Sequence, residues 1–161
     1  MVSDYLELGI NLIIIRGLSF FSFDAKVYLA DINILISALL WPHSKPAVVL
    51  LHAARNHELG LCDYIIFELR DVLKRKAPHA LIDMEVFLSE LSYTLVPAPF
   101  FPQKMINDPK DQPILNAAII ADVDIIISGD KHFLELNLEH PRIMTAAEYL
   151  KWIILACSNR S

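Results

Sequence analysis

Cysteine, glycine and positive charge are all scarce in this chain of 161 residues. Its two cysteines, Cys62 and Cys157, lie far apart without Cys-x-x-Cys or Cys/His spacing, which argues against a disulfide framework or a zinc site and predicts free thiols in a reducing cytosol. Four glycines and 55% hydrophobic residues indicate a globular protein. The net charge of −5 provides no overall positive field for nucleic acid, although a bound divalent cation can reverse the local sign.

Long hydrophobic runs are also missing. Near the N-terminus the longest uninterrupted apolar run is 12–15, and Asp4 and Glu7 occupy the region where a signal peptide has positive charge. We therefore expect a cytoplasmic protein with no membrane partner, built around one domain. The predicted division is an N-terminal extension at 1–25, a domain at 26–155 and a tail at 156–161.

From Lys26 onward, short apolar runs alternate with helical patterns. Such alternation, with continuously apolar strands, is typical of an α/β domain whose parallel sheet is covered on both faces. Strands are expected at 27–30, 59–62, 94–96, 125–128 and 142–144. Helices are expected at 34–40, from just after Ser44 to about 56, at 64–76, from 83, at 114–121 and after 145.

Several polar residues are suited to capping these helices. Ser44 precedes a helix with Pro in its first turn, Asp63 precedes the next, and Thr145 with Glu148 forms a capping box. Asp108 followed by Pro109 matches an N-cap with Pro at N1, which would place Asp111 at N3, and Asn33 is a candidate cap after the first strand. In the helix from 83, Val86, Phe87, Leu88 and Leu91 are expected to face inward.

Acidic residues recur where apolar strands end. Asp31 lies in an almost wholly apolar run, where burying an unpaired carboxylate costs several kcal/mol. Asp130 follows the apolar run at 125–128, and ligand sites in open parallel sheets lie outside such carboxyl ends. Asp108 and Asp111 stand near the start of one helix, toward the end of a proline-rich loop at 97–113, and Glu68 lies one turn into another. These acids can converge at one edge of the sheet.

A convergence of carboxylates needs neutralising. Two carboxylates about 4 Å apart repel by roughly 4 kcal/mol at an effective dielectric constant of about 20, so they protonate or bind a cation. Carboxylates without histidine or thiol partners favour Mg²⁺ or Mn²⁺ over zinc. The alternatives are local: Asp108 and Asp111 as helix-terminal residues, and Glu68 on a solvated helix flank.

The pattern resembles the PIN domain family of metal-dependent ribonucleases. The matching motifs are D-[ST]-N at 31–33 (DIN), E-L at 68–69, D-x-x-[IL]-x-x-A at 111–117 (DQPILNA) and [TS]-[GR]-[DN] at 128–130 (SGD). Order and spacing agree from about 27 to 152, and 107–133 is similar in particular to VapC-type toxins of toxin–antitoxin pairs. Two departures are Ile32, in place of a hydroxyl residue, and an N-terminal segment without a family counterpart.

The resemblance implies a three-layer α/β/α sandwich with a mainly parallel sheet of four to five strands, and makes 26–155 a nuclease domain. It also implies Mg²⁺ or Mn²⁺, cleavage of single-stranded RNA by a metal-activated water, frequent homodimers and an antitoxin partner. The implied catalytic and metal-binding residues are Asp31, Glu68, Asp111 and Asp130, with Asp108 as a further ligand candidate and Asn33 and Ser128 in support. Phosphate contacts are assigned to Arg70, Lys74, Arg75 and Lys131, whose alternative role is a solvated helix end.

Two other functions fit the same sequence. With Ile32 where a hydroxyl is usual, the chain could be a catalytically impaired PIN module that binds RNA or an antitoxin. A haloacid-dehalogenase-type phosphatase also has an Asp at a strand end and a later Gly-Asp, but it usually needs a second Asp where this chain has Asn33.

Overall fold

The structure is a computed structural model, and it describes residues 26–158 apart from 100–103. The predicted extension at 1–25 lies outside the described residues, as do residues 159–161 of the predicted tail, so that division of the chain stays a prediction. Cys62 is buried and free, as the cysteine spacing predicted.

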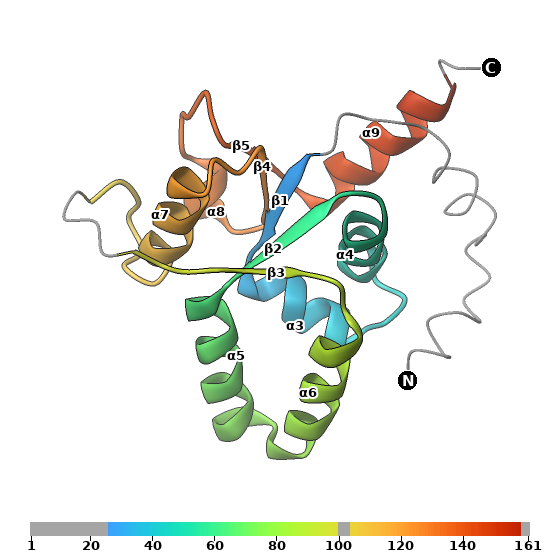
Figure 1. Cartoon of the computed structure of the whole chain (residues 1–161), viewed down its shortest axis with the longest axis vertical. Helices are drawn as coiled ribbons and strands as arrows, with labels where there is room; N and C mark the ends of the chain where they lie inside the picture. Colours follow the sequence, from blue (N-terminus) through green and yellow to red (C-terminus); the bar gives the residue numbers. More distant parts are fainter. Residues whose placement is uncertain (1–25, 100–103, 159–161) are drawn as a thin grey trace.

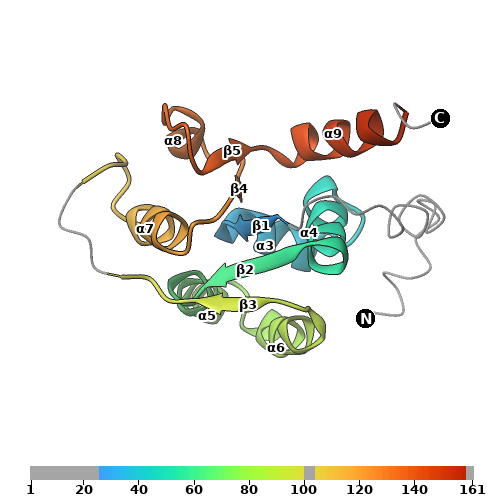
Figure 2. The ribbon, with the colours of Figure 1, turned by 45° about the horizontal axis from the view of Figure 1, so that its top comes forward.

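The core of the molecule is a five-stranded sheet with the order β3-β2-β1-β4-β5 (Figure 1). Every neighbouring pair is parallel, as predicted. Figure 2 shows the strands in succession from β3 at the bottom to β5 at the top. The strands are β1 (Val27–Ala30), β2 (Glu58–Cys62), β3 (Thr94–Val96), β4 (Ile125–Ile127) and β5 (Arg142–Met144).

Helices cover both faces of this sheet. Figure 1 shows α3, α5 and α6 grouped on one side of the strands and α7 and α8 on the other, which confirms the α/β fold with helices on both faces. The helices are α3 (Ile32–Leu40), α4 (Lys45–Asn56), α5 (Asp63–Lys76), α6 (Leu81–Glu90), α7 (Gln112–Ile120), α8 (Lys131–Leu134) and α9 (Ala146–Ser158), with a 3₁₀ turn at Pro78–Ala80.

Burial explains why the strands are continuously apolar. The strands β1 and β4 lie side by side in the middle of the sheet, and residues 28–30 and 126–127 are fully buried. On α5 the helical spacing of 65, 66, 69, 72 and 73 predicts one buried stripe; Ile65, Ile66, Leu69 and Leu73 are buried, whereas Val72 is partly exposed. A strand that is covered by helices on both faces has no solvent-facing side, so its residues need not alternate between apolar and polar.

The caps are partly as predicted. Ser44 caps α4, and Thr145 and Glu148 form the capping box, in which each backbone N–H bonds to the other residue's side chain at 2.8 and 3.2 Å. The prediction for Asn33 was wrong: α3 begins two residues earlier than expected, Asp31 is its N-cap, and Asn33 is exposed in the first turn. Asp63 is the first residue of α5 rather than its cap.

The inward face of α6 also differs from the prediction. Met84 is fully buried with Phe87 and Leu88, whereas Val86 is 39% exposed. The helix begins at Leu81, and the buried positions 84, 87, 88 and 91 follow the i, i+3, i+4, i+7 spacing of one helix face, from which position 86 is displaced.

In the part of the chain that the structure describes, no single helix is long and apolar enough to cross a membrane. The adjoining α3 and α4 reach that length only together, across a bend of 108°.

Candidate active site

Two of the predicted acids lie at the carboxyl edge of the sheet, where neighbouring strands end. Asp31 follows β1 and Asp130 follows β4, and these strands are hydrogen-bonded neighbours in which Ala30 pairs with Ile127. Both acids are N-caps, of α3 and α8, so each is held where a strand gives way to a helix. Asp111 is the N-cap residue of α7.

Asp31 is fixed by hydrogen bonds on both carboxylate oxygens. It is 2% exposed; Oδ1 accepts a hydrogen bond from the N–H of Ile34 at 3.0 Å, and Oδ2 accepts one from the hydroxyl of Ser128. The same Ser128 oxygen accepts from the N–H of Asp130 at 3.0 Å. Burial raises the pKa of Asp31, while these bonds act in the opposite direction. Ser128 therefore links the two strand-end acids and supplies a hydroxyl to Asp31, although position 32 is Ile.

Asp111 carries negative charge that nothing near it neutralises fully. Its Oδ2 is buried without a hydrogen-bond partner, and its side chain makes no capping bond to α7. Burial raises its pKa from 3.8 to about 6, with further contributions from the charges of Asp130, Asp108 and Asp31, while His132 acts to lower it. Because each of these acids affects Asp111 electrostatically, the structure brings the group into one region.

The loop that precedes α7 is held by two amide side chains. Gln112 Oε1 accepts from the N–H groups of Met105 and Ile106 at 2.8 and 3.2 Å, and its Nε2 donates to Asn116 Oδ1 at 2.7 Å. Asn116 Nδ2 donates in turn to the carbonyl of Pro99 at 3.3 Å, so both ends of the loop are tied to one helix face. These bonds were not predicted from the sequence, although two amides spaced i, i+4 in the segment DQPILN indicate that Gln112 and Asn116 share one helix face.

The prediction that Asp108 caps a helix was wrong. The helix α7 begins at Gln112, with Pro113 in its first turn, so the Pro after Asp111 marks the start instead of Pro109. Asp108 forms a turn: its Oδ1 accepts from the N–H of Lys110 at 2.9 Å and its carbonyl from the N–H of Asp111 at 3.2 Å. Asp111 is consequently at the N-cap and not at N3.

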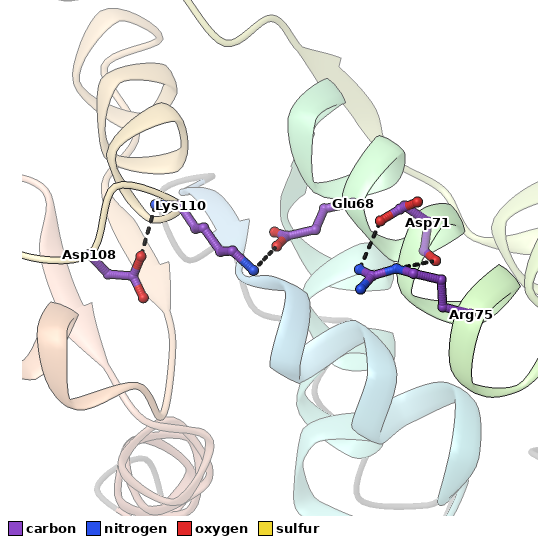
Figure 3. Close-up of polar contacts among 5 residues, drawn as sticks. All are labelled: Glu68, Asp71, Arg75, Asp108 and Lys110. Atoms are coloured by element: carbon purple, nitrogen blue, oxygen red, sulfur yellow. Dashed lines mark hydrogen bonds and ion pairs between the residues drawn. The ribbon is translucent and has the colours of Figure 1, made fainter.

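Glu68 reaches this region from α5. Its Oε1 lies 3.5 Å from Lys110 Nζ, across the space between α5 and the turn before α7 (Figure 3). Tyr64, one turn earlier on α5, also belongs here, since burial and then the charges of Glu68, Asp108 and Asp111 raise the pKa of its phenol. Tyr64 and His132 were not identified from the sequence, and neither was the pairing of Lys110 with Glu68, because nothing local links these residues to the acids.

The basic residues expected to contact RNA differ in their surroundings. Arg70 makes a two-pronged ion pair with Glu85 at 2.6 and 3.0 Å. Arg75 pairs with Asp71 at 2.8 Å, one turn away on α5 (Figure 3). Lys74 and Lys131 make no ion pair with any residue that the structure describes.

The residue types at this edge fit a hard divalent ion. The available donors are carboxylate oxygens, one of them the buried and unpartnered Oδ2 of Asp111. Among the residues described, however, no three His, Cys, Asp or Glu side chains form a group that could hold a metal ion. Glu68 is directed to Lys110, and Asp130 Oδ1 accepts from the N–H of His132 at 2.8 Å.

Comparisons with known proteins agree with this arrangement. A family model described as "PIN domain" matches residues 27–132. Among solved structures, the fold is similar to a chain in the crystal structure of VapBC2 from Rickettsia felis bound to a DNA fragment from its promoter. That match has a TM-score of 0.60 and 16% sequence identity, and it covers 74% of this chain and 98% of the other.

No curated protein matches the chain. At 16% identity the structural likeness concerns the fold, and the family follows from the sequence match, which includes all four acidic motifs and most of the domain. The family match gives the phosphatase alternative no support. The chain belongs to the PIN domain family.

Proposed function

We propose that this protein is a Mg²⁺- or Mn²⁺-dependent endoribonuclease and the toxin component of a toxin–antitoxin pair. Family membership supports a nuclease, and the gathering of acids at the carboxyl edge supports a metal-dependent one. The observation on which the proposal depends most is Asp111, whose partnerless buried oxygen lies within electrostatic reach of Asp130, Asp108 and Asp31.

In this proposal Asp31, Asp111 and Asp130 would hold the ion, with Asp108 as a further candidate. Glu68 would either bind the ion or orient the attacking water. A bound divalent ion lowers the pKa of a bound water and neutralises charge that builds up on the phosphoryl group. Ser128 would fix the position of Asp31 relative to Asp130 through its two hydrogen bonds. Asn33, exposed in the first turn of α3, would contact substrate or water only at the edge of the site.

Single-stranded RNA is the proposed substrate, with 5′-phosphate and 3′-hydroxyl products. Lys74 and Lys131 are the better placed of the proposed phosphate contacts, because Arg70 and Arg75 would first have to leave Glu85 and Asp71. The structural likeness to VapBC2 supports the proposal of an antitoxin partner. A homodimer and a cytoplasmic location complete the proposal.

The test is Mn²⁺-dependent cleavage of single-stranded RNA by the Asp31→Asn variant. Asn is as good an N-cap as Asp, so α3 should form normally while a negative ligand is lost. We expect cleavage to fall at least a hundredfold with an unchanged circular dichroism spectrum. Asp83→Asn, an equal change of charge at an exposed position in α6, should cleave like the unaltered protein. Undiminished cleavage by Asp31→Asn would remove the assignment.

A second candidate is a PIN module that binds RNA or an antitoxin without cutting. It is favoured by the ion pair that occupies Glu68 and by the lack of a metal-holding group within residues 26–99 and 104–158. Calorimetric titration separates the two functions: heat of Mn²⁺ binding in the low-millimolar range or below supports the nuclease, and its absence supports the module.

A further inference from the structure

One lysine lies among the acids of the candidate site. In the described part of the chain, the ion pair between Lys110 and Glu68 is the only one that involves Asp31, Glu68, Asp108, Asp111 or Asp130. The two partners differ in exposure: the Glu68 side chain is 16% exposed and that of Lys110 is 67% exposed. The carboxylate therefore stays within the site, whereas the ammonium group reaches it from solvent.

The backbone of Lys110 is fixed by the same acids. Its N–H donates to Asp108 Oδ1 at 2.9 Å, and the next N–H, that of Asp111, donates to the carbonyl of Asp108 at 3.2 Å (Figure 3). This turn places the lysine between two acids of the site. Its four-carbon side chain is flexible, and among the residues that the structure describes the ammonium group pairs with Glu68 alone.

We propose that Lys110 is a positioning residue that competes with the divalent ion for Glu68 and thereby weakens metal binding. The inference rests on the proposed function. An ion that takes Glu68 as a ligand, directly or through water, has to replace the ammonium group, and the displaced cation stays tethered nearby. Lys110 thus sets how much Mg²⁺ or Mn²⁺ the site needs.

The direct test is the dissociation constant for Mn²⁺ alone, measured by calorimetry on the full chain without RNA. Lys110→Met removes the competing charge and should tighten Mn²⁺ binding by about two- to fivefold, the range expected for a pair with one exposed partner. Lys110→Arg keeps a cation and should bind like the unaltered protein. Lys104→Met, the same loss of charge at an exposed residue of the same loop, should leave the constant unchanged.

A second measurement shows whether the effect passes through Glu68. In a Glu68→Gln background, Lys110→Met should no longer tighten Mn²⁺ binding, because the pair is already gone. An equal gain there would mean a general effect of charge and would overturn the inference. So would Mn²⁺ binding that Lys110→Met leaves unchanged or weakens, and the nuclease proposal would then still stand. If the unaltered protein binds no Mn²⁺, both proposals fail together.

Discussion

Asp111 should lower the stability of the folded protein at neutral pH. Its pKa rises from 3.8 to about 6 on folding, which corresponds to an upper bound of about 3 kcal/mol of unfavourable ionisation, reduced by solvent screening because the side chain is partly exposed. Because this pKa is higher in the folded state, Asp111 contributes most favourably to stability below pH 3.8, where it is protonated in both states. That contribution is lost as the pH rises through about 6. Asp111→Asn removes the cost of the charge and keeps a residue suited to the N-cap.

We therefore expect Asp111→Asn to raise the free energy of unfolding by about 1–3 kcal/mol at pH 7.5, measured by urea denaturation. The gain should shrink toward zero as the pH falls from 6 to 3.8, while the variant loses Mn²⁺-dependent activity. Asp83→Asn, at an exposed position, serves as the control and should change stability little. A destabilised Asp111→Asn at pH 7.5, or an equal gain at every pH, would refute the reasoning.

Three further substitutions test other parts of the structure. Ser128→Ala removes the donor to buried Asp31 and should lower the free energy of unfolding by about 1–3 kcal/mol in urea titrations; an unchanged value would contradict the link. Asn116→Ala removes the bonds to Gln112 and to the carbonyl of Pro99 and should speed limited proteolysis between residues 97 and 111. An unaltered rate of cleavage would mean that the two amides do not hold this loop. Burial lowers the pKa of His52 to about 4, so its contribution to the free energy of unfolding is present above pH 6.5 and is lost as the pH falls toward 4. In His52→Gln the free energy of unfolding should therefore fall less steeply between pH 6.5 and 4. An equal slope in urea titrations would contradict this role.

The strands could be predicted because each is a short apolar run between residues that end it. The predicted bounds of β1, β3 and β5 are those of the structure. Burial accounts for the apolar run of β1, whereas the edge strands β3 and β5 each keep exposed residues. The positions of Asp31 and Asp130 could be predicted once the strands were, because parallel strands bring their carboxyl ends to one edge of the sheet.

The parts that could not be predicted depend on tertiary contacts or on small shifts of register. Asp108-Pro109 and Asp111 with Pro113 are both plausible helix starts, and only the bonds of Gln112 to the loop select the second. In α6, Met84 takes the buried position that was predicted for Val86, because it shares one helix face with Phe87, Leu88 and Leu91. The pair of Lys110 with Glu68 joins residues of two separate elements, and no local pattern marks it.

The most direct test of the central claim is a crystal structure of the protein grown with Mn²⁺, analysed by anomalous scattering. The account predicts a Mn²⁺ peak at the carboxyl edge, with oxygens of Asp31, Asp111 and Asp130 as ligands and Glu68 bound directly or through water. Crystals that contain Mn²⁺ without a peak among these acids, or with the ion bound only elsewhere, would contradict it.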